Sequence, residues 1–101
     1  MRIVVLFNLR PGVDPADYER WARETDIPGV RGLPSCADFQ VYRATGLFGS
    51  NAAPPYRYIE TIDIRGVDAF VADVSTEAVQ KVAGEFQRFA DNPLFITTEA
   101  L

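Results

Sequence analysis

The sequence predicts one α+β domain over residues 1–101, in which strands and helices follow one another in the order β-α-β-β-α-β. Two observations lead to this order: four apolar stretches have strand length, and two other stretches repeat their apolar residues at helical spacing. The length also favours a single domain, since typical domains have about 100–150 residues. Hydrophobic residues make up 48% and charged residues 24% of the chain, as in an ordinary folded domain.

The first strand and the first helix are marked by their ends. Apolar residues dominate Arg2–Leu9, and a Pro-Gly turn ends this strand. Asp14 followed by Pro15 is typical of a helix start, because it combines an N-cap residue with proline at the first helical position. We expect Pro28, Gly29, Gly32 and Pro34 to break this helix. Its apolar and aromatic face consists of Tyr18, Trp21, Ala22 and Thr25.

A long hairpin is predicted next. Residues 38–42 alternate in polarity and indicate a half-buried second strand that ends near Gly46. Residues 49–55 are rich in turn-forming residues and predict the hairpin loop. Residues 56–64 predict the third strand, one face of which carries Tyr56, Tyr58, Glu60, Ile62 and Ile64.

The last part of the chain predicts a second helical region and a fourth strand. Residues 68–74 have the pattern of a short helix, and Ser75 is expected to cap a longer helix after it. Asn92 and Pro93 should stop this helix, and residues 94–98 predict the fourth strand. The apolar stripe of the longer helix consists of Val79, Val82, Ala83, Phe86, Phe89 and Ala90.

This order of elements is the split βαβ pattern of ferredoxin-like domains, with a four-stranded antiparallel sheet. The first strand is apolar on both sides, with Val5 on one face and Val4 and Leu6 on the other. Two helices can cover only one face of the sheet. Leaving the other face in water would forfeit several kcal/mol, at about 25 cal/mol per Å² of apolar surface. We therefore expect a homodimer that buries the second face.

The charge of the chain argues against two classes of partner. The net charge is -4 and the basic residues are scattered, with Lys81 as the only lysine. Nucleic-acid binding draws most of its affinity from clustered Lys and Arg side chains, and binding to an anionic lipid surface needs a similar patch. We expect neither a nucleic acid nor a membrane as partner.

The types of residue that are missing limit the chemistry. The chain has no histidine and a single cysteine, Cys36. The usual zinc, copper and haem ligands are therefore lacking, and neither a Ser-His nor a Cys-His dyad can form. We expect no metal site and no cofactor. An unpaired thiol fits a reducing compartment, and the apolar N-terminal run is too short for a signal peptide, so a cytoplasmic location is expected.

Four stretches carry a family resemblance: residues 6–14 (LFNLRPGVD), 25–28 (TDIP), 41–46 (VYRATG) and 89–96 (FADNPLFI). On these stretches, and over the whole chain, the sequence resembles the RedY-like HapK proteins of the dimeric α/β barrel superfamily, which are named from prodigiosin-type pigment pathways. The resemblance implies two ferredoxin-like subunits joined through their sheets, each with a cleft between sheet and helices.

The resemblance also directs attention to two positions. Related families of the superfamily end the first helix with a His-x-Pro signature, and here Asp26 stands in the place of the histidine. Polyketide cyclases of the same fold carry a pocket histidine on the third strand, where Tyr58 stands in this chain. Acid-base chemistry based on histidine is therefore not expected.

Three residues are candidates for catalysis. Asp26 lies near a helix end, where the helix dipole disfavours a carboxylate, although it can also simply cap the following turn. Glu60 on a strand face would need a raised pKa or a partner such as Arg43, and an exposed cross-strand ion pair is the alternative. Tyr58 can donate a hydrogen bond to a carbonyl or enolate, or it can be an ordinary core residue.

Five residues are candidates for substrate binding, namely Asn8, Trp21, Arg43, Phe86 and Phe89. The three aromatic side chains would form apolar walls for a flat ligand, although aromatic stripes at helical spacing also form ordinary cores. The amide of Asn8 would either orient a ligand or satisfy backbone groups at the strand end.

The preferred hypothesis is a cofactor-independent cyclisation or condensation enzyme of prodigiosin-type or related aromatic biosynthesis. It would act on a small aromatic or polyketide-like molecule by positioning and acid-base help. Two alternatives stay open. A cofactor-free monooxygenase of aromatic substrates would use Trp, Asn, Tyr and Arg, as relatives of this fold do, and all four types occur here. A ligand-binding or chaperoning dimer without turnover is favoured by the absence of histidine.

Overall fold

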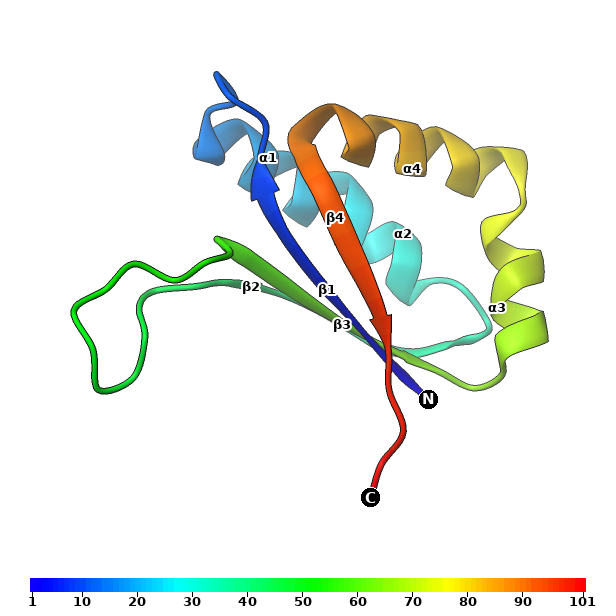
Figure 1. Cartoon of the computed structure of the whole chain (residues 1–101). Helices are drawn as coiled ribbons and strands as arrows, with labels where there is room; N and C mark the ends of the chain where they lie inside the picture. Colours follow the sequence, from blue (N-terminus) through cyan, green and yellow to red (C-terminus); the bar gives the residue numbers. More distant parts are fainter.

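A four-stranded antiparallel sheet forms one layer of the molecule, and the helices form a second layer on one of its faces (Figure 1). The computed structural model describes all residues from 1 to 101. The predicted ferredoxin-like fold is confirmed by the strand order β2-β3-β1-β4 and by antiparallel pairing throughout. The strands are β1 (Arg2–Leu9), β2 (Cys36–Arg43), β3 (Tyr58–Ile64) and β4 (Ala90–Thr97).

The first helical region ends among the residues predicted to break it, and it is divided into three parts. It consists of α1 (Pro15–Trp21), a π-helical turn η1 (Ala22–Asp26) and α2 (Ile27–Arg31). The predicted start is confirmed, because the side chain of Asp14 accepts a hydrogen bond from the N–H of Ala16 at 2.9 Å. Pro28 and Gly29 do not break the helix, whereas Gly32 follows its last residue, Arg31, as the prediction of a break there requires. Pro28 lies in the first turn of α2, where its missing N–H removes no bond within that helix.

The hairpin of β2 and β3 has the predicted faces but different ends. β2 ends at Arg43 instead of near Gly46, and β3 begins at Tyr58, two residues after the predicted start. Along β3 the buried residues alternate with half-buried ones, as the predicted face requires. The buried ones are Tyr58, Glu60, Ile62 and Ile64. Of the residues predicted for this face, only Tyr56 lies outside the strand. The connecting loop extends away from the body of the domain (Figure 1).

The second helical region consists of α3 (Val67–Val74) and α4 (Glu77–Phe89). Thr76, and not Ser75, caps α4, because the Thr76 hydroxyl accepts from the backbone N–H of Val79 at 3.4 Å. Ser75 instead ends α3 and donates to the carbonyl of Val71 at 2.6 Å. No helix of the protein has the length and apolar character needed to cross a bilayer.

β4 begins directly after α4, earlier than predicted. Ala90 is already paired with β1, so Asn92 and Pro93 lie inside the strand and do not separate it from the helix. Asn92 has a φ of 44°, and the pairing with β1 shifts by a residue next to it. Asparagine tolerates this left-handed backbone, and a bulge on an edge strand tolerates the following proline.

The two faces of the sheet differ in cover. The helix side holds the core, whose largest fully buried side chains are Val5, Phe7, Tyr18, Phe39 and Tyr58. The other side, which we call the open sheet face, has no helix over it (Figure 1). It carries Tyr42, Leu94 and Ile96 with 50%, 45% and 42% of their surface exposed. Apolar surface therefore remains uncovered on this face of the single chain.

Candidate functional site

A cavity of about 290 Å³ lies between the sheet and the helices α2, α3 and α4. Eleven of its fifteen lining residues are hydrophobic. Its aromatic walls are Phe39, Phe70, Phe86 and Phe95. Two carboxyl groups, those of Asp26 and Glu60, are the charged groups of the lining, and the remaining polar residues are Gln80 and Gln87. A mainly apolar cavity with a few convergent polar groups is the usual form of a small-molecule site.

Asp26 reaches this cavity from the last residue of the π-helical turn η1. Such turns are rare and are found frequently at functional sites. The residue is only 6% exposed. Burial raises the pKa of the Asp26 carboxyl to about 7, and no neighbouring cation lowers it. This group can therefore take up or release a proton near neutral pH.

Glu60 reaches the same cavity from the centre of the sheet, where it pairs with Val5 of β1 and Val41 of β2. It is 4% exposed, and its Oε1 atom has no hydrogen-bond partner. Burial, and after it the charge of Asp26, raises the pKa of Glu60 well above its usual range. Two buried carboxyl groups that repel each other do not ionise together readily, so we treat Asp26 and Glu60 as one interacting pair.

Tyr18 is a third member of this group that the sequence analysis did not single out. It is fully buried on α1, and its hydroxyl has no hydrogen-bond partner. Burial and the charges of Glu60 and Asp26 raise the pKa of the Tyr18 hydroxyl. The hydroxyl thus stays protonated beside the carboxyl pair. Its spacing was a usable signal, since Tyr18, Ala22 and Asp26 follow one another at four-residue intervals on one helical face.

A second polar cluster, which we call the Glu19 cluster, lies between α1 and the ends of β2 and β3. The carboxylate of Glu19 accepts hydrogen bonds from Arg43 Nε at 2.9 Å and from the Tyr58 hydroxyl at 2.8 Å. The second guanidinium nitrogen of Arg43 also pairs with Glu19, and Arg23 lies 3.5 Å from it. The Arg43 guanidinium, together with the hydroxyl of Tyr58, holds the pKa of Glu19 at about 2. This carboxylate is fully partnered.

The Glu19 cluster changes the roles considered for two predicted residues. Arg43 does not pair with Glu60, because its strand partner is Tyr58 and its exposed guanidinium reaches out to Glu19. Tyr58 is buried, but its hydroxyl is directed to Glu19. Both residues line a smaller hollow of about 100 Å³ and neither lines the larger cavity.

The predicted aromatic walls divide into two groups. Phe86 lines the cavity, as expected for a wall residue. Trp21 and Phe89 do not line it, and instead pack against each other with their ring centroids 5.3 Å apart. The indole N–H of Trp21 donates to Glu85 at 2.9 Å. These two rings belong to the aromatic packing around Tyr18.

Asn8 lies at the far end of β1, outside the cavity. Its amide nitrogen donates to the carbonyl of Pro55 at 3.1 Å, and its amide oxygen accepts from the N–H of Arg57 at 2.9 Å. Asn8 therefore ties the base of the hairpin loop to β1, which is the structural role considered for it from the sequence.

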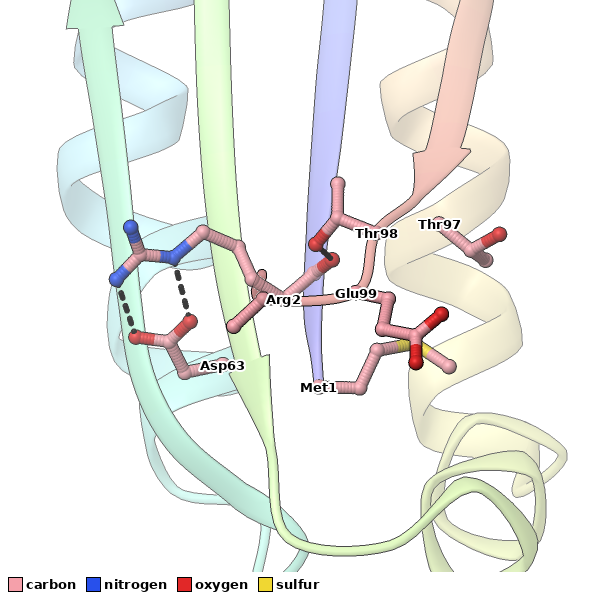
Figure 2. Close-up of a pocket in the computed structure, with 7 residues that line it drawn as sticks. Met1, Arg2, Asp63, Thr97, Thr98 and Glu99 are labelled. Carbon is pink, nitrogen blue, oxygen red and sulfur yellow. Dashed lines mark hydrogen bonds and ion pairs between the residues drawn. The ribbon is translucent and has the colours of Figure 1, made fainter.

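Another hollow, of about 1010 Å³, lies at the end of the sheet where β1 begins and β4 ends, beside the C-terminal residues (Figure 2). Arg2 donates to both carboxylate oxygens of Asp63, at 2.7 and 3.0 Å. Figure 2 shows this pair and the Thr98 hydroxyl, which donates to the carbonyl of Arg2. Every lining residue except Asp63 is exposed. Because Arg2 and Asp63 pair with each other and the hollow has no buried polar group, we place the candidate site at the Asp26 and Glu60 cavity.

The cavity therefore offers hydrogen bonds and proton transfer to a ligand. No group of three or more histidine, cysteine, aspartate or glutamate side chains lies close enough together to hold a metal ion. The ionised carboxyl of the pair can accept a proton, and the neutral one can donate it. Tyr18 does not line this cavity and instead lines the smaller hollow of about 100 Å³.

Comparison with known proteins gives a family for this arrangement. The family model described as REDY-like protein HapK matches residues 1–101. The crystal structure of HapK from Hahella chejuensis is 28% identical in sequence, with a TM-score of 0.74 over 100% of this chain and 95% of that one. A search of the curated proteins gave no significant match.

Two more distant structures share the fold. One is a dimeric ferredoxin-like protein of unknown function from Thermobifida fusca, 19% identical, with a TM-score of 0.72 over 94% of this chain and 85% of that one. The other is SnoaB, a cofactor-independent oxygenase from Streptomyces nogalater, 15% identical, with a TM-score of 0.72 over 99% of this chain and 93% of that one. At such identities the likeness extends to the fold.

Proposed function

The chain belongs to the REDY-like HapK family, and from this membership we propose that it is a homodimer that binds a small aromatic molecule of secondary metabolism between its sheet and helices. The bound molecule undergoes cyclisation or condensation without a cofactor, with Asp26 and Glu60 as the acid-base pair. The observation that carries this proposal is the burial of two unpaired carboxyl groups in an apolar cavity. Strongly raised pKa values in a cleft are typical of functional sites.

The chemistry needs both protonation states of the pair. The neutral carboxyl of Glu60 donates a hydrogen bond to a carbonyl oxygen of the ligand, while the ionised carboxyl of Asp26 removes a proton from an adjacent carbon. The pKa of about 7 at Asp26 suits this task, because a general base works best near the ambient pH. The raised pKa of Glu60 keeps this carboxyl neutral and able to donate.

Positioning contributes the second part of the rate enhancement. The walls formed by Phe39, Phe86 and Phe95 hold a flat ligand against the sheet and keep water from it. Fixing two reacting groups in one orientation can contribute several kcal/mol to a cyclisation barrier. A cavity with few titratable groups is therefore sufficient for an intrinsically reactive substrate.

The open sheet face supports the homodimer. Leu94 and Ile96 of β4 and Tyr42 of β2 are each about half exposed there, and exposed apolar surface on an uncovered sheet face favours a protein interface. Sedimentation should give a mass of about 22 kDa, twice the 11.2 kDa of one chain. Ile96→Asp should dissociate the dimer, whereas Val71→Asp, at an exposed apolar residue of α3, should not. A well-folded monomer of the wild-type protein at micromolar concentration would contradict the homodimer.

The oxygenase alternative has weaker support. SnoaB is described as a cofactor-independent oxygenase, and the oxygenases of this fold were expected to use Trp, Asn, Tyr and Arg. In this chain Trp21, Asn8 and Arg43 all lie outside the cavity, as does the hydroxyl of Tyr58. These four residues do not meet around one ligand, so we place the oxygenase second.

The acid-base role can be tested with 2-tetralone, a two-ring ketone with exchangeable α-protons. The wild-type protein should accelerate deuterium exchange at these positions, as measured by NMR in D₂O, and Asp26→Asn and Glu60→Gln should each lower that acceleration by about 100-fold. Glu24→Gln removes a charge from an exposed residue of the same π-helical turn and serves as the control.

The outcomes separate the three hypotheses. Binding of 2-tetralone without exchange would indicate a ligand-binding protein without turnover. Oxygen uptake with an electron-rich phenol, measured with an oxygen electrode, would indicate the oxygenase. Exchange that is unchanged in both carboxyl variants would remove Asp26 and Glu60 from catalysis.

A further inference from the structure

The distribution of charge around the cavity is one-sided. Of the ten Lys and Arg residues in the chain, none is in the cavity lining, whereas two carboxyl groups are. Arg43 and Arg23 pair with Glu19, and Arg2 pairs with Asp63. Arg31 donates to the backbone carbonyl of Phe39 at 2.9 Å. These four basic side chains are thus engaged elsewhere, and the lining itself offers an anionic ligand no counter-charge.

The cavity also has unused hydrogen-bond acceptors. Glu60 Oε1 is buried and has no partner, and no basic side chain approaches Asp26. The amide nitrogen of Gln80, one of the two lining amides, already donates to the carbonyl of Val74 at 2.7 Å. Leaving a buried acceptor without a donor destabilises the protein. A ligand that brings its own donors would remove this destabilisation.

We propose that the cavity selects a one- or two-ring apolar ligand that carries a protonated or N–H-bearing nitrogen, which lies between Asp26 and Glu60, and that it rejects anionic ligands. This inference rests on the ligand-binding function proposed above and adds the charge class of the ligand. The size follows from the cavity, since about 290 Å³ is at the lower end for small-molecule sites.

A cationic ligand has a measurable consequence for the protons of the pair. Because burial holds the Asp26 carboxyl partly neutral near pH 7, a bound cation favours its ionised form and drives a proton into solution. The other titratable group that faces Asp26 and Glu60 is the Tyr18 hydroxyl of α1. The cavity residues from α2, α3, α4, β1 and β2 include no titratable side chain. Affinity for a cation should therefore rise with pH as the pair ionises.

The test uses three naphthalene probes that share a ring system and differ in charge: 2-naphthylmethylamine as the ammonium ion, 2-naphthalenemethanol as the neutral probe and 2-naphthoate as the anion. Calorimetric titration of the full chain near neutral pH should rank them in this order, with about tenfold between neighbours. Titration in two buffers of different ionisation enthalpy should show proton release with the ammonium probe alone.

Variants of the cavity residues test whether this ranking of affinities arises in the cavity. Asp26→Asn combined with Glu60→Gln should abolish the preference for the ammonium probe and the proton release, while the neutral probe still binds. Glu24→Gln, an exposed charge change on the same helical turn, should leave the ranking as it is. Ala83→Trp, which fills the cavity from α4, should abolish binding of all three probes. Thermal melting confirms that each variant is folded.

Each unexpected binding result would contradict either the charge selection or the ligand-binding function. Equal binding of the ammonium and neutral probes, or binding of naphthoate as tight as that of the alcohol, would overturn the charge selection and leave the ligand-binding function in place. An ammonium preference that survives in the double variant would arise from the net negative surface and would also overturn it. Absence of binding for every probe would contradict the proposed ligand-binding function itself.

Discussion

Two carboxylate sites flank the same helical segment and have opposite environments. In the Glu19 cluster the carboxylate accepts hydrogen bonds from Arg43 and Tyr58, and its pKa is lowered to about 2. Seven residues further along the chain, Asp26 is buried with Glu60, no cation lies near it, and its pKa is raised to about 7. One site is fully partnered and the other is left without partners.

The contrast shows that the missing partners of Asp26 and Glu60 are not due to a shortage of cations nearby. Arg20 and Arg23 are on the same segment. Arg20 pairs with the exposed Asp17, and Arg23 pairs with the half-buried Glu19. Unpaired carboxyl groups in a core destabilise the fold, and apolar residues of similar size would serve stability better. Residues that weaken the fold in this way are expected at functional sites.

The largest effect should be an inverted pH dependence of stability. The folded-state pKa of Asp26, about 7, lies above its unfolded value, so the native state binds a proton that the unfolded state has lost. The free energy of unfolding should therefore fall between pH 5 and pH 8, by about 3 kcal/mol from Asp26 and by a further amount of the same sign from Glu60. Asp26→Asn should remove the Asp26 part of this loss. Urea unfolding at several pH values measures it. Stability that rises with pH over this range would show that the pair is not buried in its neutral form.

The Glu19 cluster should show the opposite sign. Because the pKa of Glu19 is lowered in the folded state, its stabilising effect is present above its unfolded pKa and is lost as the pH falls toward 2. Glu19→Gln should cost about 2 kcal/mol near neutral pH and nothing in strong acid. The exposed Arg20 and Asp17 pair is the matched control, and Asp17→Asn should have little effect. Equal losses for the two variants would mean that the cluster adds no stability beyond a surface ion pair.

The smallest effect should come from Tyr58→Phe, which separates the two sites functionally. The variant loses one hydrogen bond to Glu19 and keeps its ring in the core. We expect a loss of about 1 kcal/mol and a fall in melting temperature of about 4 °C, with 2-tetralone exchange and naphthalene binding unchanged. A selective loss of ligand binding in a variant of unchanged stability would instead restore Tyr58 to the ligand site, where the family resemblance placed it.

Sequence patterns predicted part of the candidate site. The alternation of β3 placed Glu60 on the same strand face as Tyr58 and Ile62, and the structure shows that this face is the helix side of the sheet. The end of the first helical region indicated Asp26 as unusual. The sequence could not exclude an ion pair between Glu60 and Arg43, because alternation gives the face of a strand and not the direction in which a long side chain extends. Tyr18 was missed because its aromatic ring accounts for its place in the core without reference to its hydroxyl.

The sequence by itself determined the strand order along the chain, the faces of the elements and the presence of an apolar open sheet face, because these follow from residue spacings of two and 3.6 that act locally. Only the tertiary structure decided which carboxylate receives a cation. Glu19 meets Arg43 and Tyr58 from positions 24 and 39 residues away, and such contacts depend on strand register and on where a helix crosses the sheet. The same packing encloses Asp26 and Glu60 together, and burial in that shared cavity, not any local sequence pattern, raises their pKa values.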